Sequence, residues 1–222
     1  MKNEILKVLY EDNHLIAVFK PAGLLVQGDA SGAISLMDIV KEYLKEKYDK
    51  PGDVFLGLVH RLDRPVSGIV LFAKTSKGAS RVSAQFRNRE VSKNYTAVVE
   101  GIIEKENNIE LYLEKDEKSR KAIVHTETAE NALKASLSYK VLHTEKDRTW
   151  VKIELHTGRF HQIRASFSYI KHPIVGDSKY GSHIKYKEGE IALCATELSF
   201  KTATGDKEIK LSLSIEEVFH FS

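Results

Sequence analysis

The chain has 222 residues, of which 42% are hydrophobic and 29% charged, so it can bury a sizeable core and has an ordinary globular composition. No apolar stretch is long enough to predict a membrane-spanning helix, which argues against an integral membrane protein. The single cysteine, Cys194, excludes an internal disulfide, and we find no signal peptide, so we expect a cytoplasmic protein.

Positive charge is concentrated in two segments of the sequence. Residues 57–95 contain eight basic and two acidic side chains, and residues 158–187 contain six basic and one acidic. Because the whole chain has a net charge of +3, the remainder carries −8. If the two segments meet, they form a site for a polyanion; the alternative is that they are the solvated faces of helices.

The first part of the chain mixes strands and helices. Residues 5–10 and 15–20 predict two strands, joined by a turn at Glu11-Asp12-Asn13. Ser35 and Asp38 have the spacing of a capping box, which predicts a helix. Its apolar positions are Leu36, Ile39, Val40, Tyr43 and Leu44. The continuous apolar run 68–73 predicts a strand buried on both faces. A second helix is expected after Ser76, with Ala79, Val82 and Phe86 on its inner face.

The second part is rich in strands. Strands are predicted at 94–99, 109–113, 122–128, 135–142 and 150–155, followed by a helix at 160–170 and strands near 191–201 and 211–215. The turn at 145–148 predicts a hairpin between the strands on either side. Many strands with short turns and few helices predict an α+β fold with a mixed, mainly antiparallel central sheet. We find no linker or repeat and therefore expect one domain over 1–222.

Sequence motifs for common cofactors are missing. We find no phosphate-binding glycine loop, no C-x-x-C and no H-E-x-x-H, and His156 and His161 lack a third partner that would predict a zinc site. Cys194 lies in an apolar strand, where a buried thiol is expected to be inert. We therefore expect that an enzyme built on this chain uses a carboxylate and no metal or organic cofactor.

Four stretches carry a resemblance to a known family. They are EDNHLIAVFKPAGLLVQGD (11–29), HRLDRPVSGIVLFAKT (60–75), KNYTAVVEG (93–101) and TGRFHQIRASFSYIKHPIVGDSKYG (157–181). In this order they closely resemble the motifs of the RluA-like family of pseudouridine synthases, which act on uridines of ribosomal and transfer RNA. The resemblance implies the pseudouridine synthase fold and isomerisation of uridine in RNA, by base flipping, N1–C1′ cleavage and C5–C1′ re-attachment.

The chain departs from the family pattern at a few positions. Val66 stands where many members have threonine, Ala165-Ser166 follow Arg164 where relatives often carry histidine or glutamine, and Lys171 replaces a usual glycine. We expect these differences to affect contacts with RNA rather than the chemistry. Because the motifs begin almost at Met1, we expect no S4-type RNA-binding module ahead of them.

The resemblance implies catalytic roles for three residues. Asp63 is the carboxylate that acts on the ribose, as a nucleophile at C1′ or as a base at C2′. Arg164 pairs with it and keeps it ionised; the alternative is an arginine that binds phosphate. Tyr95 stacks on the uracil and manages the C5 proton, the alternative being ordinary packing in a strand.

Two residues just before the carboxylate are assigned to RNA binding and base flipping. Arg61 resembles the residue that enters the stack left by the flipped uridine, which offsets part of the cost of flipping. His60 accompanies it, although it could simply fix the turn. Arg64 is expected to be a phosphate contact or a solvated charge, and Lys20 and Lys74 receive no catalytic role.

The expected partner is a structured ribosomal or transfer RNA with a uridine that can be flipped out, with no membrane and no obligate protein partner. Two other functions stay open: a catalytically silent RNA-binding module, and a nucleoside hydrolase, which would need a positioned water and usually a metal or second acid. Residues 26–34, 103–121 and 182–190 are candidate loops for RNA specificity.

Overall fold

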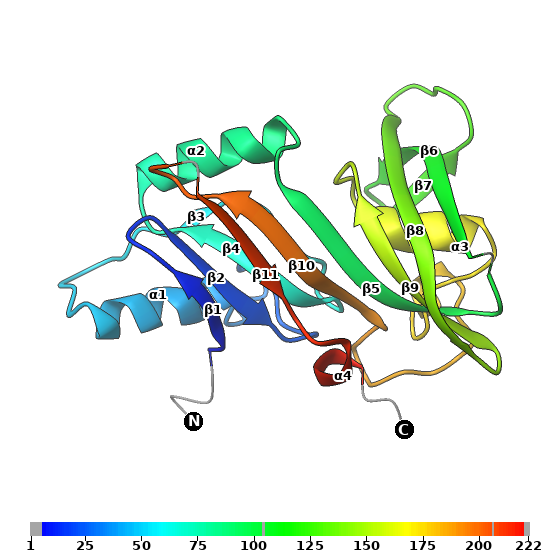
Figure 1. The fold of residues 1–222 in the computed structure, drawn as a ribbon, viewed down its shortest axis with the longest axis horizontal. Helices are drawn as coiled ribbons and strands as arrows, with labels where there is room; N and C mark the ends of the chain where they lie inside the picture. The colour runs from blue at the N-terminus through cyan, green and yellow to red at the C-terminus, as the bar shows by residue number, and fades with distance from the viewer. Residues whose placement is uncertain (1–5, 104, 206, 220–222) are drawn as a thin grey trace. The chain divides into compact units, whose positions relative to one another are not determined.

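The chain divides into two compact units (Figure 1). The structure is a computed structural model that describes residues 6–103, 105–205 and 207–219. The first unit comprises Met1–Val91 and Glu197–Leu213, and the second comprises Ser92–Thr196 and Ser214–Ser222. That residues 1–222 act as a single catalytic domain stays a prediction.

The first unit is built on antiparallel strands. β2 pairs with β1 and with β4, the short β3 pairs with the end of β4, and β11 pairs with residues 197–201 of β10. The strands are β1 (Val8–Glu11), β2 (Leu15–Lys20), β3 (Gly57–Leu58), β4 (Ser67–Ala73), β10 (Leu193–Lys201) and β11 (Glu208–Ser212). β4 is buried from Gly68 to Ala73, which confirms the expected interior strand.

Both expected helices of the first unit are present, and the first begins at its predicted cap. α1 (Leu36–Lys47) has the expected capping box, since Ser35 Oγ accepts a hydrogen bond from the Asp38 amide and Asp38 accepts one from the Ser35 amide. Its buried face is narrower than predicted, because Ile39 is 36% exposed. α2 (Ser76–Arg87) packs on β3 and β4 and is capped by Thr75.

The second unit contains a longer antiparallel sheet in the order β5-β9-β8-β6-β7, with the beginning of β10 beside β5. α3 packs against β6 and β7. The strands are β5 (Ser92–Glu100), β6 (Glu106–Asp116), β7 (Lys121–His125), β8 (Leu133–Glu145) and β9 (Arg148–Leu155). The helices are α3 (Gln162–Tyr169), a short 3₁₀ turn η1 (Ser178–Tyr180) and α4 (Ile215–Val218).

These elements confirm the α+β prediction and correct it in two places. The hairpin at 145–148 is present, with Lys146 in the left-handed region at φ 53°. The strand expected at 211–215 ends at Ser212, and Ile215 begins α4. The expected loop 103–121 consists mostly of β6, because its alternating residues Ile109, Leu111 and Leu113 are buried.

No helix in the described part of the chain is long and apolar enough to cross a membrane.

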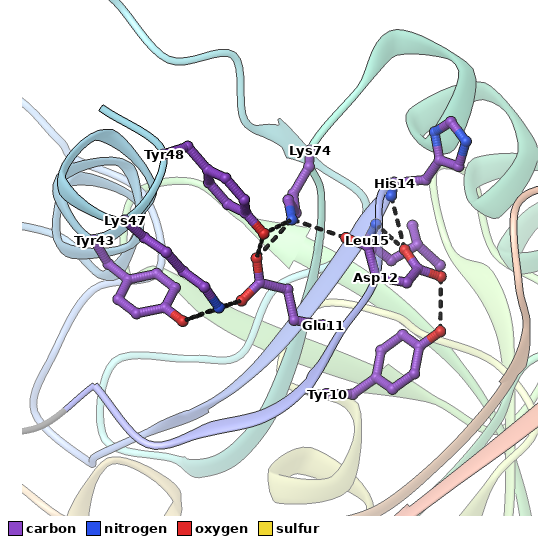
Figure 2. Close-up of polar contacts among 9 residues, drawn as sticks. All are labelled: Tyr10, Glu11, Asp12, His14, Leu15, Tyr43, Lys47, Tyr48 and Lys74. Carbon is purple, nitrogen blue, oxygen red and sulfur yellow. Dashed lines mark hydrogen bonds and ion pairs between the residues drawn. The ribbon is translucent and has the colours of Figure 1, made fainter. Parts of the chain in front are cut away.

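A polar cluster around Glu11 joins β1, α1 and the end of β4 in the first unit (Figure 2). Glu11 accepts hydrogen bonds from Lys74 at 2.6 Å, Lys47 at 2.8 Å, Tyr48 at 2.6 Å and Tyr43 at 3.1 Å. Burial alone would raise the pKa of Glu11, but the hydrogen bonds from Lys47, Lys74 and Tyr48 outweigh it and lower the pKa to about 2. Lys74 is therefore a structural residue in this unit.

Replacing Glu11→Gln should destabilise the protein in a pH-dependent way. A carboxyl group whose pKa falls from 4.5 to about 2 on folding stabilises the folded state above pH 4.5, and this contribution disappears as the pH drops towards 2. We expect a loss of about 2–3 kcal/mol at pH 7 that shrinks below pH 4.5, measured by urea denaturation. Glu42→Gln, at an exposed position of α1, is the control. A loss that stays constant down to pH 2 would contradict this account.

Candidate active site

Asp63 lies half-buried on the segment between β3 and β4 in the first unit. Its carbonyl accepts a hydrogen bond from the Val66 amide at 3.1 Å, which closes a tight turn immediately before β4. Gly68, at the start of that strand, has φ 127°, a conformation that glycine adopts without the cost it imposes on other residues. The carboxylate is thus carried by a short turn fused to a fully buried strand.

A pair of hydrogen bonds ties this turn to the one that follows β2. The Gly23 amide donates to the Arg64 carbonyl at 2.8 Å, and Arg64 Nε donates to the Gly23 carbonyl at 3.0 Å. Arg64 therefore has a structural contact that its expected roles, a phosphate ligand or a solvated charge, did not include. The sequence contained a signal for this contact, because Gly23, the partner of Arg64, is the glycine of the Lys-Pro-x-Gly motif.

Lys20 adds a buried cation between the same two turns. Its side chain is fully buried, and its ammonium donates to the carbonyls of Pro21 at 3.0 Å, Leu24 at 2.8 Å and Arg64 at 3.2 Å. Three carbonyl oxygens supply the hydrogen bonds that a buried ammonium requires. Lys20 thus connects the end of β2 to the residue next to Asp63.

The two residues assigned to RNA lie on the same segment. His60 Nε2 accepts a hydrogen bond from the Leu71 amide at 2.9 Å, and its ring stacks on Phe86 of α2 with centroids 4.9 Å apart. His60 therefore fixes the segment to β4, which is one of its two expected roles. Arg61 is exposed. The parts of these residues in RNA binding and base flipping stay predictions.

In the second unit, Arg164 is held by a buried carboxylate. Arg164 Nε donates to Asp177 Oδ2 at 2.6 Å and Nη2 donates to Oδ1 at 2.9 Å, and the guanidinium lies 5.0 Å from the centre of the Tyr180 ring. The side chains of Arg164 and Asp177 are 5% and 1% exposed. Asp177 is a residue that we did not single out from the sequence, although it stands in the Gly-Asp of the fourth motif.

A polar network fixes the beginning of α3, which carries Arg164. Gln162 Oε1 accepts hydrogen bonds from Thr157 Oγ1 at 2.8 Å and from the Arg159 amide at 2.9 Å, and Gln162 Nε2 donates to the Ser136 carbonyl of β8 at 3.0 Å. The Thr-Gly-Arg-x-His-Gln motif therefore pins the helix to the sheet. This places the Arg164 backbone in one position relative to β8.

The remaining candidate, Tyr95, lies on β5 of the second unit opposite Ile153 of β9, and its side chain is buried. The structure thus places Asp63, Arg61 and His60 in the first unit and Tyr95 and Arg164 in the second. Within the described ranges, no group of three or more histidine, cysteine, aspartate or glutamate side chains is positioned to hold a metal ion.

Comparison with known proteins identifies the family. The model of the RNA pseudouridylate synthase family matches residues 14–169, which include Asp63, Tyr95 and Arg164. The chain belongs to this family. The match confirms the resemblance of the four motifs, since it begins within the first and ends within the last.

The chain matches some relatives over nearly their full length and others over about half of it. It is 31% identical to tRNA pseudouridine synthase C of Vibrio vulnificus, over 97% of this chain and 93% of that protein. It is 32% identical to ribosomal large subunit pseudouridine synthase D of Pseudomonas aeruginosa, over 81% of this chain and 55% of that protein. The chain therefore spans little more than half the length of several curated relatives.

A solved structure supports the same fold. The human protein titled RNA Pseudouridylate Synthase Domain Containing 4 matches with a TM-score of 0.77 at 23% identity, over 94% of this chain and 88% of that one. At this level of identity the match establishes the shared pseudouridine synthase fold.

Replacing Lys20→Met should destabilise the first unit. Methionine fills a similar volume but cannot donate, so the hydrogen bonds from the ammonium to the carbonyls of Pro21, Leu24 and Arg64 are lost, and we expect a loss of about 1–3 kcal/mol in urea denaturation. Lys45→Met, at an exposed position of α1, should change the stability little. Equal stability of the two variants would show that the Lys20 ammonium does not hold the turns together.

Proposed function

We propose that the protein is a cofactor-independent pseudouridine synthase that isomerises uridine in ribosomal or transfer RNA. The observation that supports this most strongly is the match to the RNA pseudouridylate synthase family over residues 14–169, with the aspartate of the second motif intact as Asp63. The relatives' names refer to transfer RNA in one case and to the large ribosomal subunit in another, so both RNAs are candidate substrates.

The reaction rearranges bonds without oxidation or addition. The uracil N1–C1′ bond breaks, the base turns within the site, and C5 bonds to C1′. The C5 proton then leaves and N1 takes up a proton, so the product has the mass of the substrate. Positive charge develops at C1′ as the first bond breaks, which is why a carboxylate is suited to this position, as in glycosidases.

Asp63 is the carboxylate in this proposal, acting as nucleophile at C1′ or as base at C2′. Its fixed backbone supports the assignment, because the bonds through Arg64, Gly23 and Lys20 tie the turn that carries Asp63 to the turn after β2. A site that acts on one atom of a flipped nucleotide depends on such rigidity.

Arg164 is assigned the role of keeping Asp63 ionised. Asp177 accepts hydrogen bonds from Nε and Nη2 of the guanidinium, and the proposal pairs the same guanidinium with the Asp63 carboxylate. Asp177 then serves as a positioning residue that fixes the guanidinium plane. An alanine at position 164 would leave the buried Asp177 carboxylate without its partner, so that variant would lose folding stability as well as activity.

Tyr95 and Arg61 complete the proposed site. A duplex or stacked loop hides C1′ and C5 of a uridine, so the base must be flipped out at a cost of a few kcal/mol. Arg61 is exposed and stands two residues before Asp63, and it is proposed to fill the gap that the flipped base leaves in the RNA stack. His60 holds this segment against β4 through the Leu71 amide. The Tyr95 ring is proposed to stack on the flipped uracil, with its hydroxyl managing the C5 proton.

Asp63→Asn should abolish isomerisation. Purified protein is incubated with unmodified transfer and ribosomal RNA transcripts that carry tritium at C5 of uridine, and release of tritium to water reports the loss of the C5 proton. We expect the variant to be slower by at least about a thousandfold, as is usual for an essential catalytic side chain. Asp53→Asn, an exposed aspartate of the same unit, should keep wild-type activity. An Asp63→Asn protein that is folded and retains a tenth of the activity would refute the assignment.

The same reaction mixtures separate the alternatives. A nucleoside hydrolase would release free uracil and leave abasic sites, which mass spectrometry of the RNA detects. A silent RNA-binding module would bind RNA and release no tritium with either substrate.

Tyr95→Phe should separate binding from turnover. The ring is retained, so the affinity for RNA should stay within about twofold, whereas loss of the hydroxyl should slow tritium release by about 100-fold or more. RNA affinity is measured by fluorescence anisotropy and turnover by tritium release. Wild-type turnover in this variant would show that the hydroxyl takes no part in proton removal.

A further inference from the structure

The outward side of α2 in the first unit carries only positive charge. Lys77, Arg81 and Arg87 are exposed, and the sequence of the helix, SKGASRVSAQFR, contains no acidic residue. Lys77 and Arg81 are four residues apart and lie on the same face. Each follows an exposed serine, Ser76 or Ser80, whose side chain is short enough to let a large anion approach the helix closely.

Within the described residues, the exposed cations of α2 are not paired with acidic side chains. Some exposed basic side chains elsewhere pair with a neighbouring carboxylate, as in Lys115–Glu117, Lys134–Glu110, Lys146–Glu145, Arg148–Asp147 and Lys210–Glu208. Across the described residues, no carboxylate lies within ion-pair distance of Lys77, Arg81 or Arg87. Glu90, just after the helix, accepts a hydrogen bond from Asn88 at 3.2 Å. The field of the α2 cations is therefore not cancelled locally.

Arg89, just after α2, adds a fourth cation. Its backbone has a left-handed conformation, which is unfavourable for residues other than glycine. The Glu90 amide donates to the Gln85 carbonyl and the Arg89 amide donates to the Phe86 carbonyl, which together form a Schellman motif. Arg89 occupies the left-handed position of this motif, at φ 60°, where glycine is preferred. An exposed arginine here carries a conformational cost that glycine would avoid, and its charge offers a reason for its presence.

Two aromatic rings connect this end of the helix to the segment that carries Asp63. Phe86, in the last turn of α2, stacks on His60, which is three residues before Asp63. The exposed Arg61 is the residue next to His60. The last turn of α2 therefore lies next to the segment that carries Arg61 and Asp63, and the helix extends from there over twelve residues, or about 18 Å.

We propose that Lys77, Arg81, Arg87 and Arg89 form a track that binds the phosphates of the RNA strand flanking the flipped uridine. The inference rests on the proposed function for the identity of its partner and adds the surface that holds the strand. Charge complementarity favours RNA, because a phosphate backbone presents regularly spaced anions that several cations can neutralise together. Phosphate contacts fix the register of the strand and do not read its sequence.

The salt dependence of RNA binding tests the track. The probe is a fluorescent stem–loop RNA without uridine, which cannot react, and the phosphate contribution that it measures does not depend on sequence. In the triple variant Lys77→Gln, Arg81→Gln, Arg87→Gln, the dependence of log affinity on log salt should become shallower by about 0.7–0.9 for each phosphate that is no longer neutralised. Affinity at about 0.1 M salt should fall roughly tenfold or more. Glutamine preserves helix propensity, so the fold should be retained.

A matched control replaces three cations that have acidic partners: Lys115→Gln, Lys134→Gln and Lys210→Gln. Its salt dependence should equal that of the wild type. A slope for the α2 triple variant that equals the wild-type slope would overturn the proposal and would leave this face to a partner of another class, such as an acidic protein.

Arg89→Gly gives a result that a purely structural role could not produce. Glycine relieves the left-handed backbone, so the midpoint of urea denaturation should rise while the affinity for RNA falls. Lys146→Gly, at the left-handed position of the β8–β9 turn, should raise the midpoint and leave RNA affinity unchanged. Unchanged affinity in Arg89→Gly would remove this residue from the track.

These outcomes are separable from those of the proposed function. Binding to a uridine-free probe does not require isomerisation, so an inactive protein with α2-dependent binding would refute the catalytic proposal alone. An active enzyme whose affinity for RNA does not depend on the α2 charges would refute only the proposal of the track.

Discussion

The buried ammonium of Lys20 is the constraint on which the first unit's part of the site depends. An ammonium without hydrogen bonds in the interior would cost several kcal/mol, so the turn after β2 and the turn before β4 must place their carbonyls around it together. The reciprocal bonds between Gly23 and Arg64 close the same junction. A carboxylate on an irregular segment thereby gains the rigidity of the strands on either side.

The second unit also contains a buried cation that is held by hydrogen bonds. Arg164 is buried against Asp177, and Gln162 ties the beginning of its helix to β8. In both units, residues of the family motifs build this support: Lys20, Gly23 and Arg64 in the first unit, and Thr157, Gln162 and Asp177 in the second. The proposed chemistry needs this support, because a carboxylate that attacks one carbon of a flipped nucleotide gains little from a mobile scaffold.

Local patterns in the sequence predicted the elements whose signals are local. The capping box at Ser35 marks α1, the apolar run gives β4, and the turn at 145–148 gives a hairpin. Contacts between distant residues were not predictable in this way. The bond from Arg64 to Gly23 joins residues 41 positions apart, and Asp177 as the partner of Arg164 becomes visible only once α3 and the segment before η1 are folded. The prediction of a strand at 211–215 was wrong, because β11 ends at Ser212 and α4 begins at Ile215.

The most direct test of the central claim is a crystal structure of the protein bound to a substrate RNA. The account predicts that the Asp63 carboxylate lies about 3–4 Å from the ribose of a flipped uridine, with the Arg164 guanidinium within hydrogen-bonding reach and the Tyr95 ring against the base. A complex in which the Asp63 side chain faces solvent, or lies more than about 10 Å from both the guanidinium and the ring, would contradict it.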